Sequence, residues 1–142
     1  EYDAILLSYA GIKCLKIEDK ITEIFSIEEM IPSAGQGIIA LQSRANDHEV
    51  NLLLSKINDK ETFYKAQAER NVLKILEGDC ETAVGVHSII QDHKIILEAE
   101  LFSLDGSQRF YIKKSSEIEK ANDLGKKVGS LLKAKSNNSY KK

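Results

Sequence analysis

The hydrophobic period of the chain changes at Gly78, and this change restricts the fold more than any other feature of the sequence. Over residues 58–76 apolar side chains share one broad arc of a helical wheel, which predicts a long amphipathic helix. Over residues 84–112 the period is two, which predicts three strands, and a final helical stripe covers residues 118–131. The sequence therefore predicts an α+β domain in which two helices cover one face of a three-stranded antiparallel sheet.

A cysteine lies on the turn between the long helix and the first strand. Gly78 follows the last helical residue, where a left-handed residue is usual and glycine adopts that conformation without steric cost. Cys80 is therefore expected at a loop apex, although a free cysteine is more often a small buried hydrophobe, and that alternative stays open. The helix C-terminus and the flanking Asp79 and Glu81 are negative, so nothing local favours the thiolate. Cys80 is thus not expected to be an activated nucleophile of the protease type, and a group that reacts once with a strong electrophile needs no such activation.

Length, charge and composition exclude several classes of function. The 142 residues suffice for one ordinary domain, or for one small domain with parts of others. A net charge of −2 gives no polyanion-binding surface, so no nucleic-acid partner is expected. No apolar run has the length of a membrane span and no signal peptide is visible, so the protein is expected in the cytoplasm without a membrane partner. The two cysteines and three histidines lack zinc-ligand spacing, so no metal is expected.

The segments that precede the long helix predict incomplete α/β structure. Short apolar runs at residues 4–7, 29–31 and 38–41 are typical of strands. Helices are expected over residues 8–15 and 17–25. These pieces cannot close a core alone.

Two local signals mark turns and helix starts in this region. Gly35 and Gly37 flank Gln36, which favours a turn or hinge over a place where the backbone approaches a ligand. Asn46 and Asn58 each precede a glutamate by three residues, so both are expected to be helix N-caps.

Charged side chains in the predicted domain have simple structural interpretations. Lys65 and Glu69 lie inside the apolar arc of the long helix at i, i+4 spacing, which favours an ion pair at the helix edge. The alternative is that Glu69 or Arg70 faces another domain. Glu98 and Glu100 alternate along a strand and are interpreted as surface charges rather than as a general acid/base pair.

Five motifs, in the same order and at matching separations, resemble the porphobilinogen deaminase (hydroxymethylbilane synthase) family, and they occupy residues 3–13, 31–37, 68–70, 76–80 and 105–107. The resemblance implies a transferase of heme and tetrapyrrole biosynthesis, which joins four porphobilinogen molecules into hydroxymethylbilane and releases ammonia. It implies that Cys80 forms a thioether to a dipyrromethane cofactor that is never turned over. It also implies that Leu7, Ser8, Gln36 and Gly37 lie near this cofactor or the substrate.

The same resemblance implies parts of three domains. Residues 1–31 would end domain 2, which resembles periplasmic binding proteins, and residues 32–57 would be a hinge and a return to domain 1. Residues 58–142 would be the C-terminal cofactor-anchoring domain, with a disordered tail at residues 133–142. The catalytic aspartate would lie upstream of Glu1, so this fragment alone is expected to be inactive, and the full-length protein is expected to be a monomer.

Two positions depart from the family's pattern. Cys14 stands where the family commonly has an arginine that contacts substrate carboxylates, and a thiol cannot replace that charge. Asp79 stands where the family usually has a second glycine, and aspartate tolerates left-handed dihedrals better than most residues. Arg44, Arg70 and Arg109 are too few for all the carboxylates of a hexapyrrole. The alternatives to the enzyme are a non-catalytic binding module that retains the α+β domain and a thiol redox domain.

Overall fold

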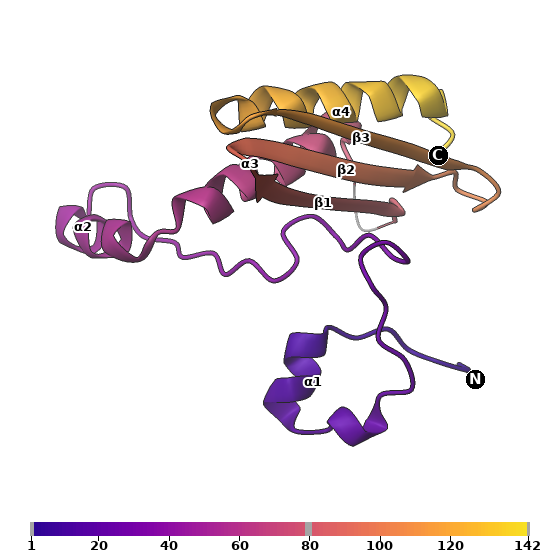
Figure 1. The fold of residues 1–142 in the computed structure, drawn as a ribbon, viewed down its shortest axis with the longest axis horizontal. Coiled ribbons are helices and arrows are strands. Elements are labelled where there is room, and N and C mark those ends of the chain that lie inside the picture. Colours follow the sequence, from indigo (N-terminus) through magenta and orange to yellow (C-terminus); the bar gives the residue numbers. More distant parts are fainter. Residues whose placement is uncertain (1, 79–80, 142) are drawn as a thin grey trace. The chain divides into compact units, whose positions relative to one another are not determined.

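The structure, a computed structural model, describes residues 2–78 and 81–141 (Figure 1). The chain divides into two compact units, Glu1–Met30 and Ile31–Lys142. None of the helices in the described part of the chain is long and apolar enough to cross a membrane.

The N-terminal unit contains one short helix and one 3-10 turn. Helix α1 spans Tyr9–Leu15, as predicted, and the Ser8 hydroxyl caps it by accepting a hydrogen bond from the Gly11 N–H at 3.1 Å. The second helix expected over residues 17–25 is wrong, because only a 3-10 turn at Glu18–Lys20 forms there. The strand expected at residues 4–7 is also absent among the described residues, since a strand needs a neighbour for its hydrogen-bond ladder and this segment has none.

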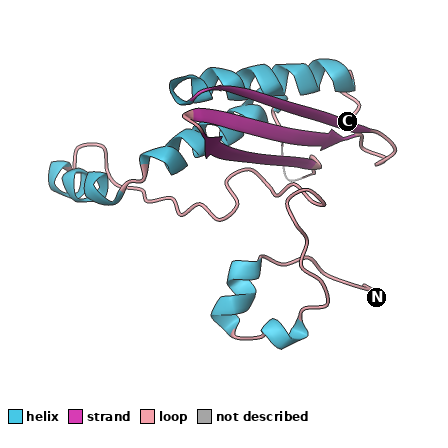
Figure 2. Ribbon diagram, viewed as in Figure 1, coloured by secondary structure: helices cyan, strands magenta, loops and turns pink. Residues whose placement is uncertain are grey.

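The C-terminal unit is built on an antiparallel sheet with strands in sequence order, as Figure 2 shows: β1 (Val84–Gln91), β2 (Lys94–Phe102) and β3 (Arg109–Glu117). Asp92 and His93 join β1 to β2 in a two-residue turn, and both have the positive φ that a type I′ turn requires. Val86, Ala99 and Ile112 lie opposite one another across the three strands and are buried. The predicted three-stranded antiparallel sheet is therefore confirmed.

Two helices, α3 (Lys60–Leu76) and α4 (Ala121–Ser136), pack on the buried face of this sheet (Figure 1). The helices approach closely at Gly125, where a Cβ atom would overlap the carbonyl oxygen of Ala68. The hydrophobic core takes residues from both helices and all three strands, including Val72, Leu76, Leu97, Leu101, Val128 and Leu132. The predicted α+β domain with helices on one face is confirmed.

Helix α2 (His48–Ile57) precedes α3, and both begin one residue later than predicted. Asp47 caps α2 by accepting from the Val50 N–H, and Asp59 caps α3 by accepting from the Thr62 N–H. The asparagines at 46 and 58 are therefore not the caps. An aspartate carboxylate supplies a stronger acceptor at the same helix start.

Two other predictions from the sequence are wrong. The strands expected at residues 29–31 and 38–41 do not form in the described chain, where these residues are irregular. The tail is not disordered over residues 133–141, because α4 continues to Ser136 and Tyr140 is only 2% exposed. The Tyr140 ring fills a core position, which fixes the end of the chain against α3.

Candidate functional site

Helix α3 ends shortly before the predicted anchor, Cys80, in the sequence. Glu77, not Gly78, adopts the left-handed conformation at the helix end, with φ of 53°, and the Gly78 N–H bonds to the Leu73 carbonyl at 3.4 Å. The prediction that Gly78 supplies the left-handed residue is therefore wrong. Cys80 and Asp79 lie outside the described residues, so the covalent anchor at Cys80 stays a prediction.

Two lysines from the end of the chain hold Glu77 in this conformation. The Glu77 carboxylate lies 3.0 Å from Lys133 Nζ and 2.9 Å from Lys141 Nζ. Hydrogen bonds from Lys141 and Lys133 lower the pKa of Glu77 from 4.5 to about 2, and the same contact raises the pKa of Lys141. These ion pairs restrict the Glu77 side chain at a position where the backbone has positive φ.

A buried tyrosine makes a second contact with the same helix end. The Tyr140 hydroxyl donates a hydrogen bond to the Leu76 carbonyl at 3.0 Å, and both residues are buried. Leu76 is the last residue of α3, so its carbonyl has no acceptor role within the helix. The end of α3 is therefore held by contacts of Glu77 and of Tyr140.

The predicted cofactor contacts Gln36 and Gly37 lie on an exposed turn in the C-terminal unit. The Gln36 N–H bonds to the Ser33 carbonyl at 3.0 Å, and Gly35 and Gly37 both have φ of 79°. A Cβ atom on either glycine would meet nothing within 4 Å, so open space lies in front of this backbone. The glycines are thus required by the turn's conformation and also leave room for a flat group to approach.

The other two predicted contacts, Leu7 and Ser8, lie in the N-terminal unit. Leu7 is 60% exposed, and the Ser8 side chain is occupied in capping α1. Cys14 in α1 is also exposed. No group of three or more His, Cys, Asp or Glu residues that could hold a metal occurs in the described part of the chain.

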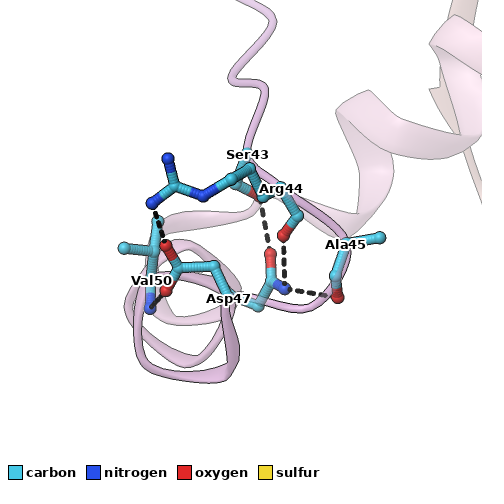
Figure 3. Close-up of polar contacts among 6 residues, drawn as sticks. Ser43, Arg44, Ala45, Asp47 and Val50 are labelled. Atoms are coloured by element: carbon cyan, nitrogen blue, oxygen red, sulfur yellow. Dashed lines mark hydrogen bonds and ion pairs between the residues drawn. The ribbon is translucent and has the colours of Figure 1, made fainter.

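Among the described residues, Arg44 and Arg109 form ion pairs. Figure 3 shows Arg44 beside Asp47, with a 2.8 Å contact from the guanidinium to the carboxylate that also caps α2. Arg109 contacts Glu100 at 2.8 Å through both Nε and a terminal nitrogen. Arg70 is exposed on α3.

The acidic pair on β2 is not simply solvent-exposed. Glu100 is only 7% exposed and is paired with Arg109, so its interpretation as a surface charge is wrong. Glu98 accepts a hydrogen bond from the Tyr111 hydroxyl at 2.7 Å and lies 3.4 Å from Lys113. Burial, followed by the hydrogen bond to Glu98, raises the pKa of Tyr111 to about 12. These contacts stabilise the outer face of the sheet.

The burial and the hydrogen bonds of Glu69 were not predicted from the sequence. This side chain is 5% exposed, and the expected ion pair with Lys65 is replaced by hydrogen bonds from Gly35 and Ser88. A charged residue within the apolar arc of α3 was the signal that a buried, bonded carboxylate could be present. The hydrogen-bond partners, Gly35 and Ser88, are distant from Glu69 in the sequence, and no sequence pattern indicates these contacts.

Comparisons with known proteins agree over both units. Residues 1–52 match the model of the porphobilinogen deaminase dipyromethane cofactor binding domain, and residues 63–134 match that of the porphobilinogen deaminase C-terminal domain. A porphobilinogen deaminase of Desulforamulus reducens is 36% identical over 134 residues, which are 94% of this chain and 43% of that protein. A porphobilinogen deaminase of Coxiella burnetii is 38% identical over 131 residues, 92% of this chain and 43% of that protein.

A third relative, a porphobilinogen deaminase of Prochlorococcus marinus, is 35% identical over 133 residues, which are 94% of this chain and 42% of that protein. The chain thus spans less than half of the length of the curated relatives it matches. The two family models together cover the N-terminal unit, the turn at Gln36 and most of the α+β domain. On these matches, the chain belongs to the porphobilinogen deaminase family.

Proposed function

We propose that this chain is the cofactor-anchoring part of a porphobilinogen deaminase. Such an enzyme joins four porphobilinogen molecules into hydroxymethylbilane and releases ammonia. The observation that carries the proposal is the pair of family matches. The cofactor-binding match includes Leu7, Ser8, Gln36 and Gly37, and the C-terminal match includes Cys80.

The described residues fit a dipyrromethane group in one respect that geometry can test. The turn at Gln36 and Gly37 is exposed, and a Cβ atom on Gly37 would meet open space, so a planar pyrrole can reach this backbone. When bound, the cofactor would supply the pyrrole end to which substrate is added. The chain's contribution is to hold that group in place through Cys80 and to keep the turn at Gln36 and Gly37 open toward it.

The local electrostatics of the Cys80 turn support an anchor. Cys80 would hold the cofactor through one thioether bond from its sulfur to a pyrrole methylene carbon, with the thiol proton released to the pyrrole nitrogen. The C-terminal end of a helix and the sequence neighbours Asp79 and Glu81 do not activate a thiolate for repeated turnover. A single attack on a strong electrophile does not require that activation.

Proton transfer is proposed to belong to residues outside this chain. The family resemblance assigns the catalytic aspartate to another part of the enzyme. Binding of the substrate carboxylates also needs cations from elsewhere, because Arg44 and Arg109 are already paired with acids here. We therefore expect residues 1–142 alone to consume no porphobilinogen. The full-length protein is expected to be a cytoplasmic monomer.

Intact-mass measurement of the full-length protein, purified from a host that makes porphobilinogen, tests the proposal. The expected result is a dipyrromethane adduct that is lost in Cys80→Ser. The matched control is Cys14→Ser, which removes the other cysteine and should retain the adduct. An unmodified Cys80 in the wild-type protein would contradict the proposal and favour a non-catalytic module.

A further inference from the structure

The carboxylate of Glu69 joins three parts of the C-terminal unit. Its Oε1 atom accepts hydrogen bonds from the Ser88 N–H at 3.0 Å and the Ser88 hydroxyl at 2.7 Å. Its Oε2 atom accepts from the Gly35 N–H at 2.7 Å. Helix α3, strand β1 and the segment before the turn at Gln36 therefore meet at one side chain.

Burying the Glu69 carboxylate at this position costs free energy, because the group loses its contacts with water. Glu69 is 5% exposed and lies next to Ala68 and near Val72, which are fully buried, so an apolar residue would fit the same arc of α3. An ionised carboxylate in such surroundings is tolerated when hydrogen bonds replace the water it has lost. The three donors supply those bonds, and two of them are backbone N–H groups that would otherwise lack partners.

The segment at residues 31–35 is attached to the edge of the sheet by contacts independent of Glu69. Strand β1 is an edge strand, and its Val86 N–H donates to the Pro32 carbonyl at 2.8 Å. Gly85 leaves space for Ile31, whose carbonyl oxygen would lie 2.5 Å from a Cβ atom at that position. Ile31 is buried, and Ala34 packs against the core. Glu69 thus completes an attachment that begins at Ile31 and Pro32.

This attachment bears on the hinge that was expected within residues 32–57. The boundary between the two compact units lies between Met30 and Ile31, so residues 31–35 belong to the C-terminal unit. The last attached residue, Gly35, is followed directly by Gln36 and Gly37. Any motion of these two residues relative to β1 is therefore limited by the bond from Gly35 to Glu69.

We propose that Glu69 is a positioning residue that holds Gln36 and Gly37 in a fixed place relative to β1 and α3. The effect on catalysis rests on the proposed function. Glu69 would keep the turn at Gln36 and Gly37 in a constant orientation toward the pyrrole chain anchored at Cys80. Glu69 does not touch substrate in this proposal. It acts through Gly35.

Glu69→Gln distinguishes the Oε1 contacts with Ser88 from the Oε2 contact with Gly35. A carboxamide has one acceptor oxygen, which can keep both bonds from Ser88, and its NH₂ group then faces the Gly35 N–H, donor against donor. Ser88→Ala is the matched control, because it removes only the hydroxyl bond to Oε1 and leaves Oε2 free to accept from Gly35. Glu69→Gln should therefore release Gly35 selectively, and Ser88→Ala should not.

Amide hydrogen exchange in the full-length protein is the first measurement. In the wild-type protein the Gly35 amide should be protected along with that of Ser88. In Glu69→Gln it should exchange about tenfold faster or more, as expected for the loss of a hydrogen bond to a charged group, while the Ser88 amide changes less. Fast exchange of Gly35 in the wild-type protein would overturn the attachment, and this test does not require that the variant folds.

Intact mass and steady-state kinetics of the same proteins test the consequence. Glu69→Gln should keep the adduct on Cys80 but lose about tenfold in kcat/KM for porphobilinogen. An adduct with unchanged kcat/KM, despite a released Gly35, would overturn the positioning role. Absence of the adduct in the wild-type protein would instead refute the proposed function and leave the attachment measured by exchange intact.

Discussion

Replacing Gly85 with alanine tests the attachment of residues 31–35 from the side of the sheet. A Cβ atom on Gly85 would lie 2.5 Å from the Ile31 carbonyl oxygen and 3.0 Å from the Ile31 Cβ atom. Because carbon–oxygen contacts are comfortable from about 3.3 Å, Ile31 must move by roughly 0.8 Å. The neighbouring hydrogen bond from Val86 to Pro32, 2.8 Å long, would stretch to roughly 3.6 Å if Pro32 followed, beyond the usual range.

The cost of this movement is worked from the contacts that it breaks. The lost backbone hydrogen bond contributes about 1 kcal/mol. Partial exposure of Ile31, which is only 7% exposed, adds about 1 kcal/mol. A weakening of about 2 kcal/mol raises the detached population about 30-fold. Alanine in place of glycine also restricts the unfolded chain, so the free energy of global unfolding should fall by less than this local value.

Amide exchange at Val86 and Gly35 in the full-length protein measures the detached population. Both amides should exchange about 30-fold faster in Gly85→Ala, while buried amides in α4 keep most of their protection. Gly125→Ala is the control, because its Cβ atom would overlap the Ala68 carbonyl oxygen and loosen the packing of α3 on α4 instead. That variant should raise exchange throughout the helices without a selective effect at Gly35. If the Val86 amide of Gly85→Ala exchanges as slowly as that of the wild-type protein, the reasoning is refuted.

Two predictions concern the helix end that precedes the Cys80 turn. Tyr140→Phe removes the hydrogen bond to the buried Leu76 carbonyl and should lower the free energy of unfolding by about 1 to 2 kcal/mol in a denaturant titration; an unchanged midpoint would show that the hydroxyl is not bonded there. Because the pKa of Glu77 is lowered from 4.5 to about 2, its contribution to stability is present above about pH 4.5 and is lost as the pH falls toward 2. Glu77→Gln should therefore show a smaller loss of stability over that interval than the wild-type protein, and equal pH dependence of the two would contradict the ion pairs with Lys133 and Lys141.

The α+β domain could be predicted from the sequence because its signals are local and repeated. The alternation over β2 and the apolar arc of α3 each rest on several residues, so no single exception hides the pattern. The left-handed helix end could not be assigned in the same way. Gly78 is the better residue by intrinsic preference, but Glu77 is held there by Lys133 and Lys141, which lie more than fifty residues later. No local pattern in the sequence shows these long-range contacts.

The candidate site could be predicted in its residue types but not in its connections. Gly35 and Gly37 gave a clear turn signal, and both have the positive φ that glycine favours. The hydrogen bond from Gly35 to Glu69 joins residues 34 positions apart, and the bonds from Ser88 to Glu69 join residues 19 apart. A helical wheel can show that Glu69 is out of place among apolar neighbours. It cannot show which backbone N–H groups will satisfy its oxygens.

The free edge of β1 connects the stability of the domain with the geometry of its candidate site. An edge strand presents unpaired N–H groups, and here the Val86 N–H is covered by Pro32 and the Ser88 N–H by Glu69. Proline suits this place because it offers a carbonyl and has no N–H of its own to leave unpaired. Since the residues that close the edge also hold the segment leading to Gln36, a mutation that opens the edge must loosen the candidate site as well. Variants at this edge should therefore change exchange at Gly35 and kcat/KM for porphobilinogen together, whereas variants in the packing of α3 on α4 should change the free energy of unfolding first.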